Sequence, residues 1–351
     1  MTLSSRLDDS PDELLARAAE AEAAGRLVDA VDLLQRANRL RPDADVEVRL
    51  VGLRDRGFDT LTASSSRTSW PPTYPDLTPG CDGLPEIDAS ELTEAALGSG
   101  IVNHGALVVR DLLEADQVTA MVADIDRAFA AYDDWMADDS REAALAPWFA
   151  RYRPANGYPE SKLPRNYVRG SGGVWVADTP RMMFELVELF ERKGLDRVIA
   201  AYLGERPALS VKKCTLRRVP IDCGTGWHQD GAFMGDGIRT VNVWIALTDC
   251  GGPDSDAPAL DLVPQRFDSI VETGTEGAPF DTFVGVPVVE RLAGERGILR
   301  PEFRAGDALL FDDLFLHSTG MSPTMSRERY AIESWFFAPS TFPPDQVPLL
   351  F

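Results

Sequence analysis

The sequence has little that would mark a secreted, membrane-spanning or nucleic-acid-binding protein. Its 351 residues contain no apolar run long enough to cross a bilayer, and the N-terminal segment MTLSSRLDDSPDELLARAAEA has no apolar stretch behind a basic start. Basic residues are also in deficit, because 56 Asp and Glu outnumber 35 Lys and Arg, for a formal net charge of -21. Such an excess of acid repels phosphate backbones and anionic lipids, so we expect neither nucleic acid nor a membrane as partner.

Cysteine is scarce as well. Cys81, Cys214, Cys223 and Cys250 form no Cys-x-x-Cys pair and fit no zinc module. So low a count is typical of a reducing cytoplasm, where we expect the protein to reside. The 44% of hydrophobic residues suits a globular protein with a sizeable core. The length suits one large domain with a small appendage.

The composition divides the chain into three regions. Residues 1–60 are rich in Ala, Leu, Glu and Arg and predict two or three short helices, with Pro11 at a helix start. Residues 25–42 place small residues and a proline at the intervals of one tetratricopeptide repeat. One repeat cannot bury its own apolar face, so this helical hairpin must dock, either on the main domain of its own chain or on a protein partner or second copy. Residues 61–84, rich in Ser, Thr, Pro and Gly, predict a linker, which leaves 85–351 as the main domain.

The main domain changes its pattern halfway along. ALVV, before a long stretch of helical spacing, predicts a short buried strand, and residues 179–204 predict another helical segment. Between these, residues 140–175 are irregular and rich in aromatic and basic residues, as lids over binding sites often are. Short segments rich in β-branched and aromatic residues then predict strands at 208–219, 240–249, 259–264, 282–290, 307–318 and 329–338. Helices followed by a run of strands predict a β-sandwich or barrel backed by helices.

Two of the three histidines lie in a pattern that suits a metal site. His228 and Asp230 are two residues apart in TGWHQDGAF, and on an extended segment both would project to the same side while Gln229 points away. His317, at the end of an apolar segment after a glycine turn, would add a third ligand from a distant strand. Two imidazoles and one carboxylate on one face of the ion form the ligand set of non-haem iron oxygenases. We interpret His104, which lies in a turn, as structural.

A dicarboxylate cosubstrate on such a metal needs a buried cation for its far end. Arg327 and Arg329 are the candidates, and Arg329 is favoured because it is better embedded in its predicted strand, whereas Arg327 suits a solvated position. Thr319 can offer a hydroxyl to the same carboxylate. In TVNVWIAL, Asn242 and Trp244 lie opposite the apolar face, so they either line a polar cavity or belong to the core.

With these residues in place, the sequence resembles the phytanoyl-CoA dioxygenase family from about residue 85 to 340. The resemblance rests on GALVVRDLLEADQVTAMVADID, on WHQDG, on the apolar strand that ends in His317, and on RYAI. It implies a double-stranded β-helix, a jelly-roll barrel of mainly β structure backed by helices, with iron inside. It also implies 2-oxoglutarate and O2 as cosubstrates.

The resemblance also implies roles for single residues. The family's metal ligands match His228, Asp230 and His317, and its cosubstrate contacts match Arg329, Trp244, Thr319 and Gln229. A further lysine contact belongs upstream, with Lys162, Lys212 and Lys213 as candidates. The N-terminal hairpin is not part of the family pattern.

These assignments predict an Fe(II)- and 2-oxoglutarate-dependent dioxygenase that hydroxylates a small molecule, in specialised metabolism by analogy with the breadth of the family. A halide-transferring relative would need a small residue in place of Asp230, so the carboxylate favours hydroxylation or a related desaturation or cyclisation. Basic residues in the irregular loop would suit an anionic or carrier-linked substrate, although such loops are more often solvated: Arg151, Arg153, Lys162, Arg165 and Arg169. The alternatives are a metal-binding barrel that catalyses isomerisation or hydrolysis, and a non-catalytic scaffold that uses the N-terminal hairpin.

Overall fold

A computed structural model describes residues 10–61, 65–155 and 157–351. It begins with three helices, α1 (Pro11–Ala23), α2 (Leu27–Leu40) and α3 (Ala44–Phe58). Pro11 lies in the first turn of α1, and Ser10 and Glu13 form a capping box that satisfies the free N–H groups there. The local signals in this region therefore define its helices as expected.

A mixed α/β architecture follows, built on an eight-stranded sheet in the order β1-β2-β7-β5-β9-β4-β10, with β3 paired to β4. Its pairs are antiparallel except β1 with β2. A second, two-stranded sheet joins β6 to β8. The strands are β1 (Glu86–Asp88), β2 (Ala106–Arg110), β3 (Gly173–Trp175), β4 (Ala208–Val219), β5 (Thr240–Ala246), β6 (Ala259–Leu262), β7 (Ala308–Phe311), β8 (His317–Gly320), β9 (Arg329–Phe337) and β10 (Pro348–Leu350).

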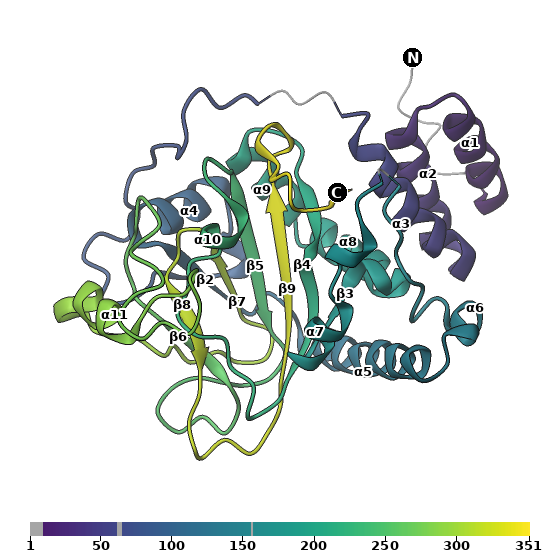
Figure 1. The fold of residues 1–351 in the computed structure, drawn as a ribbon. Coiled ribbons are helices and arrows are strands. Elements are labelled where there is room, and N and C mark those ends of the chain that lie inside the picture. Colours follow the sequence, from purple (N-terminus) through teal and green to yellow (C-terminus); the bar gives the residue numbers. More distant parts are fainter. Residues whose placement is uncertain (1–9, 62–64, 156) are drawn as a thin grey trace.

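Alternating side chains give the large sheet two different faces. Val241, Val243 and Ile245 of β5 join a core with the helices that cover one face. Trp244 and Ala246 point the other way, into a core shared with β6 of the second sheet. Figure 1 shows the large sheet between these two layers. The helices after α3 are α4 (Glu94–Ser99), α5 (Ala115–Ala137), α6 (Glu142–Leu145), α7 (Arg165–Gly170), α8 (Pro180–Arg192), α9 (Leu195–Leu203), α10 (Gly231–Met234) and α11 (Val286–Ala293).

Two of the predicted strands were wrong. The segment 282–290 leads into helix α11, where Pro287 occupies the first turn and Val288 and Val289 pack against Leu316. Burial of an apolar helix face outweighs the strand preference of its valines. The segment 307–318 is not one strand. It leaves the large sheet after Phe311, turns, and enters the second sheet as β8.

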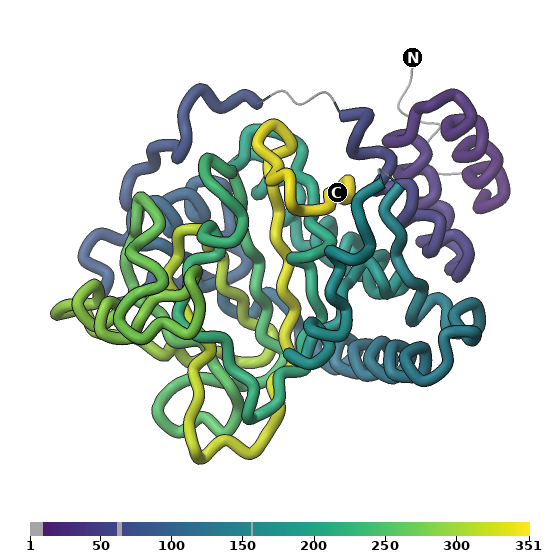
Figure 2. Tube along the Cα trace, in the orientation of Figure 1, coloured from purple at the N-terminus to yellow at the C-terminus, as the bar shows by residue number. Residues whose placement is uncertain are grey.

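The N-terminal helices pack against the rest of their own chain. Leu50 and Leu53 of α3 share a core with Phe184 of α8 and Leu350 of β10. Buried Arg54 donates to the carbonyl of Leu350 at 2.8 Å. Figure 2 shows the segment that starts at residue 65 running past one end of the large sheet. Within the described residues, no helix is both long and apolar enough to cross a membrane.

Candidate metal centre

The two histidines at the centre of the molecule are neighbours through their backbones. His228 and His317 form an isolated antiparallel bridge, in which each N–H donates to the other's carbonyl at 2.9 and 3.1 Å. Leu262 of β6 pairs with His317 on its other side. The bridge holds the two imidazole centroids 4.4 Å apart. Residues nearly ninety positions apart in the chain thus meet through main-chain hydrogen bonds.

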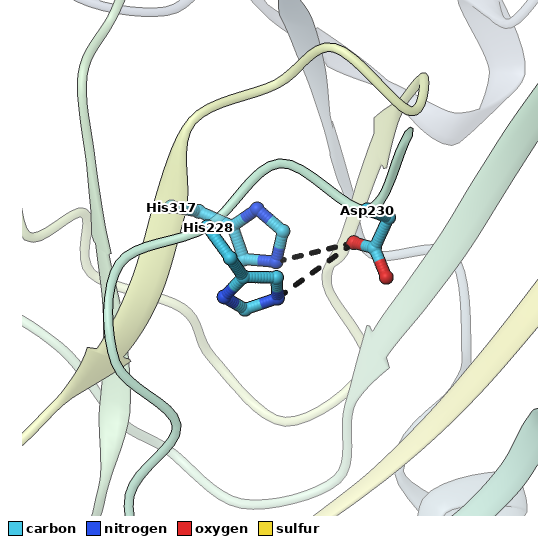
Figure 3. A group of neighbouring side chains, drawn as sticks. All are labelled: His228, Asp230 and His317. Carbon is cyan, nitrogen blue, oxygen red and sulfur yellow. Dashed lines mark ion pairs between the residues drawn. The ribbon is translucent and has the colours of Figure 1, made fainter. Parts of the chain in front are cut away.

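Asp230 reaches the same point from a turn, and not from the extended segment that we expected. Its backbone is helical (φ -61°, ψ -29°), and it caps the short helix α10. The following residue must be small, because a Cβ on Gly231 would lie 2.7 Å from the Asp313 carboxylate. The turn directs Asp230 Oδ2 to 3.8 Å from His228 Nε2 and 3.7 Å from His317 Nε2 (Figure 3).

The opposite nitrogen of each ring is held by the backbone. His228 Nδ1 lies 2.7 Å from the carbonyl oxygen of Gly226, and His317 Nδ1 lies 3.0 Å from that of Phe315. A carbonyl can only accept, so each Nδ1 carries a proton and Nε2 is the ring nitrogen directed at Asp230. Backbone contacts of this kind orient the histidine ligands of metal sites.

The charge states also suit a metal. Burial and the neighbouring His317 lower the pKa of His228 to about 4, so its ring is neutral near pH 7. Burial acts to raise the pKa of Asp230, but Lys213 and the two histidines outweigh it and lower that pKa to about 2. Lys213 Nζ donates to Asp230 Oδ1 at 2.7 Å, which leaves Oδ2 directed at the imidazoles. An ionised carboxylate beside the neutral His228 imidazole suits a divalent cation.

The donor set fits a mononuclear metal ion. Within the described parts of the chain, His228, Asp230 and His317 are the one group of His, Cys, Asp or Glu whose ligand atoms could share an ion, and they lie within 4.8 Å of one another. The three side chains are buried. Two imidazoles and one carboxylate suit non-haem iron better than calcium or magnesium, which prefer oxygen, or structural zinc, which takes four ligands.

A cavity adjoins the two histidines of the cluster. Arg329, at the start of β9, is 3% exposed and donates through Nη1 to the carbonyl of Ala259 at 2.9 Å. Its Nε has no hydrogen-bond partner, and no described carboxylate forms an ion pair with it. Burial lowers its pKa to about 10. The cavity lining is Arg217, Thr225, His228, Asn242, Trp244, Leu260, Phe311, His317, Ser318, Thr319, Arg329 and Glu333.

Several of the expected cosubstrate residues line this cavity. Asn242 and Trp244 project into it from β5, and the Trp244 ring lies 5.4 Å from the Arg329 guanidinium. The Oδ1 atom of Asn242 is buried without a hydrogen-bond partner. Thr319 lies in the lining and accepts a hydrogen bond from the backbone of Thr225 at 3.0 Å. These groups leave polar atoms directed at an enclosed space.

Other expected residues lie elsewhere. Gln229 is outside the cavity lining, because its amide donates to the Leu314 carbonyl at 2.5 Å and accepts from the Val271 N–H at 2.7 Å. These bonds turn the side chain toward neighbouring loops, and its expected contact with cosubstrate stays a prediction. Arg327 is exposed and paired with Asp256.

His104 has a separate environment. Its Nε2 lies 2.9 Å from Asp76 Oδ1 and 3.2 Å from the Thr78 hydroxyl. It stands beside Gly105, whose φ of 93° ends a short helical segment. These contacts agree with the structural interpretation of this histidine.

Sequence reasoning missed two charged residues beside the site, Arg217 and Glu333, which line the cavity. It left Lys213 among three lysine candidates, and the structure places Lys213 against Asp230. Lys213 and Arg217 share a parity on β4, as Arg329 and Glu333 do on β9. Alternation could have placed each pair on one face, but the sequence did not say that these faces meet the metal ligands. The other lysine candidates lie apart: Lys212 bonds to Tyr158, and Lys162 pairs with Asp345.

The comparisons with known proteins can now be set beside this geometry. Among solved structures, the chain is similar to EctD from S. alaskensis with 2-oxoglutarate and 5-hydroxyectoine (16% identity, 76% of this chain and 87% of that one, TM-score 0.45). It is also similar to the non-heme alpha-ketoglutarate-dependent carbocyclase SnoK from nogalamycin biosynthesis (17%, 72% and 86%, TM-score 0.43). Because these likenesses are distant, nothing about reaction or substrate is taken from them. A search of curated proteins found no match.

The fold and the three buried side chains define a mixed α/β protein with a cluster of metal-binding type that opens on an internal cavity. The family model for phytanoyl-CoA dioxygenase (PhyH) matches residues 101–328, which is more than half of the chain and includes all three cluster residues. The chain therefore belongs to the phytanoyl-CoA dioxygenase family.

Proposed function

We propose that this protein is an Fe(II)- and 2-oxoglutarate-dependent oxygenase that hydroxylates a small organic molecule. The observation that carries the proposal is the convergence of two imidazoles and one ionised carboxylate beside a cavity that also holds a buried arginine without an acid partner. The cluster accounts for a metal, and the arginine accounts for an anionic cosubstrate. The family match supports both assignments.

In this proposal, His228, Asp230 and His317 hold the iron, and Arg329 binds the far carboxylate of 2-oxoglutarate. When bound, the iron and 2-oxoglutarate together supply the oxidising power by reacting with O2. The Arg329 Nε has no other partner, so a carboxylate would satisfy a buried donor that is otherwise unpaired. Thr319, Asn242 and Trp244 would orient the cosubstrate, and the surrounding apolar side chains would exclude water.

We also propose that the two sheets form the double-stranded β-helix of this enzyme class. In support, the second sheet shares a core with the inner face of the large sheet, and the bridge between His228 and His317 adjoins β6 and β8. A jelly roll of this kind would place the metal between the sheets. Desaturation or cyclisation would use the same residues, and hydroxylation is the reaction to test first.

We also propose a division into a helical unit (1–60), a linker (61–84) and an oxygenase domain (85–351), in which the helical unit braces the oxygenase domain. The apolar face of the helices is occupied by α8 and β10, and buried Glu47 accepts from Arg181 at 2.9 Å across the same contact. A role in bracing the oxygenase domain suits these contacts better than a scaffold role, which would need that face free.

The test is release of succinate by purified protein given Fe(II), 2-oxoglutarate and O2. We expect slow release without substrate, and Asp230→Ala should abolish it together with Fe(II) binding. The matched control is Asp236→Ala, an exposed acid on the same loop, which should behave as wild type. Retention of Fe(II)-dependent succinate release by Asp230→Ala would refute the metal assignment.

A further inference from the structure

The proposed cosubstrate leaves one cation of the cavity unexplained. A dicarboxylate that binds a metal at one end has one free carboxylate, and Arg329 is sufficient to receive it. Arg217 also lines the cavity. Among the described residues its guanidinium forms no hydrogen bond and no ion pair. The cavity therefore has one more arginine than the cosubstrate requires.

Arg217 is also directed away from Arg329. Both project from the same face of neighbouring strands, since Arg217 pairs with Ala331 and Arg329 pairs with Val219. A Cβ on Gly173, in the strand on the other side of β4, would lie 3.2 Å from Arg217 Nη1. The guanidinium thus extends toward Gly173 of β3. Separate positions of this kind suit two anions better than one.

The acids nearby do not neutralise Arg217. Asp230 is paired with Lys213 at 2.7 Å. Glu333 also lines the cavity, but its carboxylate accepts from the Thr215 hydroxyl at 3.0 Å and from the Trp335 indole N–H at 3.2 Å, and it forms no ion pair with Arg217. Thus neither of these carboxylates forms an ion pair with Arg217.

Aromatic rings adjoin the metal ligands on another side. Phe233 lies 5.4 Å and Phe283 5.7 Å from the His228 ring, measured between centroids. Phe233 is 38% exposed although it belongs to helix α10 beside the buried cluster. Such rings suit the apolar body of a ligand held close to the metal.

We propose that Arg217 binds a carboxylate of the substrate, so that the substrates of this site are small organic acids with an apolar body. This inference rests on the proposed function and names the substrate class of the same cavity. Arg217 is a specificity-determining residue here, because its fork selects a carboxylate over a neutral group of the same shape.

The test compares matched acids and amides. Protein loaded with Fe(II) and saturating 2-oxoglutarate, kept free of O2, is titrated calorimetrically with phenylacetate or phenylacetamide and with hexanoate or hexanamide. Saturating 2-oxoglutarate keeps Arg329 occupied. We expect at least one acid to bind about tenfold or more tightly than its amide, as a charge-assisted hydrogen bond provides. Arg217→Gln should remove this preference and Arg217→Lys should keep part of it.

The neighbouring arginine provides the control. Arg218 projects from the opposite face of β4 and pairs with Glu328 and Asp126, so Arg218→Gln should keep the wild-type preference for acids. Equal binding of acid and amide by the wild type, binding of neither, or an unchanged preference in Arg217→Gln would each overturn the inference. Binding of Fe(II) and 2-oxoglutarate is measured in the same samples. If the wild-type protein does not bind Fe(II) and 2-oxoglutarate, the proposed function itself is refuted. If it binds both but does not prefer acids to amides, only the role of Arg217 is refuted.

Discussion

The cavity and the irregular segment at residues 151–169 both contain arginines, but only the arginines of the segment have acid partners. In the segment, each arginine has an acid partner: Arg151 with Glu160, Arg153 with Glu142, Arg165 with Asp178, and Arg169 with Asp133. In the cavity, Arg217 and Arg329 have none among the described residues. A paired arginine holds the protein's own structure together, whereas Arg217 and Arg329 face the cavity without an acid partner and are available to a ligand. The basic loop thus lends little support to an anionic substrate, and the cavity lends more.

Two buried acids show the same contrast. Asp230 has Lys213 beside it, and its pKa is about 2. Asp313 lies on the far side of Gly231, where burial and the neighbouring Asp312 raise its pKa to about 8. Asp312 itself is paired with Arg266. The partner, more than the depth of burial, decides which of these carboxylates is charged at neutral pH.

The largest effects on stability and on cosubstrate binding should come from two separate substitutions, one of a buried arginine with an acid partner and one of a buried arginine without. Arg165→Met leaves Asp178 buried without its cation and should lower the free energy of unfolding by about 3–5 kcal/mol. Arg329→Met removes a cation that has no acid partner, so stability should not fall by a comparable amount, while 2-oxoglutarate affinity should fall about a hundredfold. Denaturant unfolding and calorimetry measure the two quantities. Similar destabilisation by both substitutions would break the comparison.

A smaller effect is expected at Lys213, which fixes the orientation of Asp230. Lys213→Met should weaken Fe(II) binding about 10- to 100-fold, as loss of a contact to a metal ligand does, and Lys213→Arg should retain part of the affinity. Competition with a chromogenic chelator measures this without turnover. Lys212→Met, which alters a side chain bonded to Tyr158, is the control. Unchanged Fe(II) affinity in Lys213→Met would show that the pair does not position the ligand.

The pH dependence of stability should report on Asp313. Because its folded pKa is raised above the unfolded value, the folded state binds more protons between these values, and stability falls as pH rises through that window. The slope approaches about 1.4 kcal/mol per pH unit. Asp313→Asn should flatten it and stabilise the protein at about pH 8 by roughly 1–3 kcal/mol. Asp312→Asn should instead destabilise, because Arg266 loses its partner. A pH profile unaltered in Asp313→Asn would contradict the assignment.

The smallest effect belongs to the exposed pairs of the loop. Arg169→Gln breaks an ion pair with Asp133 at 2.7 Å near the surface and should change the free energy of unfolding by about 1 kcal/mol or less. Binding of 2-oxoglutarate and of the acid probes should be unchanged in the same calorimetric assay. A marked loss of acid binding would show that this loop contributes to the substrate site.

Much of the local structure could be predicted from local signals. The capping box at Ser10, the strand 208–219 and the strand beginning at Arg329 follow from residue types and alternation. Helix α11 could not, because its valines favour a strand and only the packing of Val288 and Val289 beside Leu316 decides otherwise. The turn after Phe311 could not be predicted either, because an apolar run of residues does not show where the chain passes from one sheet to another.

By itself, the sequence determined which residues could bind a metal and a dicarboxylate, since imidazole, carboxylate and guanidinium groups have fixed chemistry at any position. It also determined the helices and strands whose apolar spacing was unambiguous. Only the tertiary structure decided which charges are paired, because partners such as Lys213 and Asp230 or Arg165 and Asp178 lie on different elements. Ion pairs depend on distance in space, which alternation along one strand cannot supply. Arg329 and Arg217 line the cavity without an acid partner among the described residues, and no sequence pattern showed this.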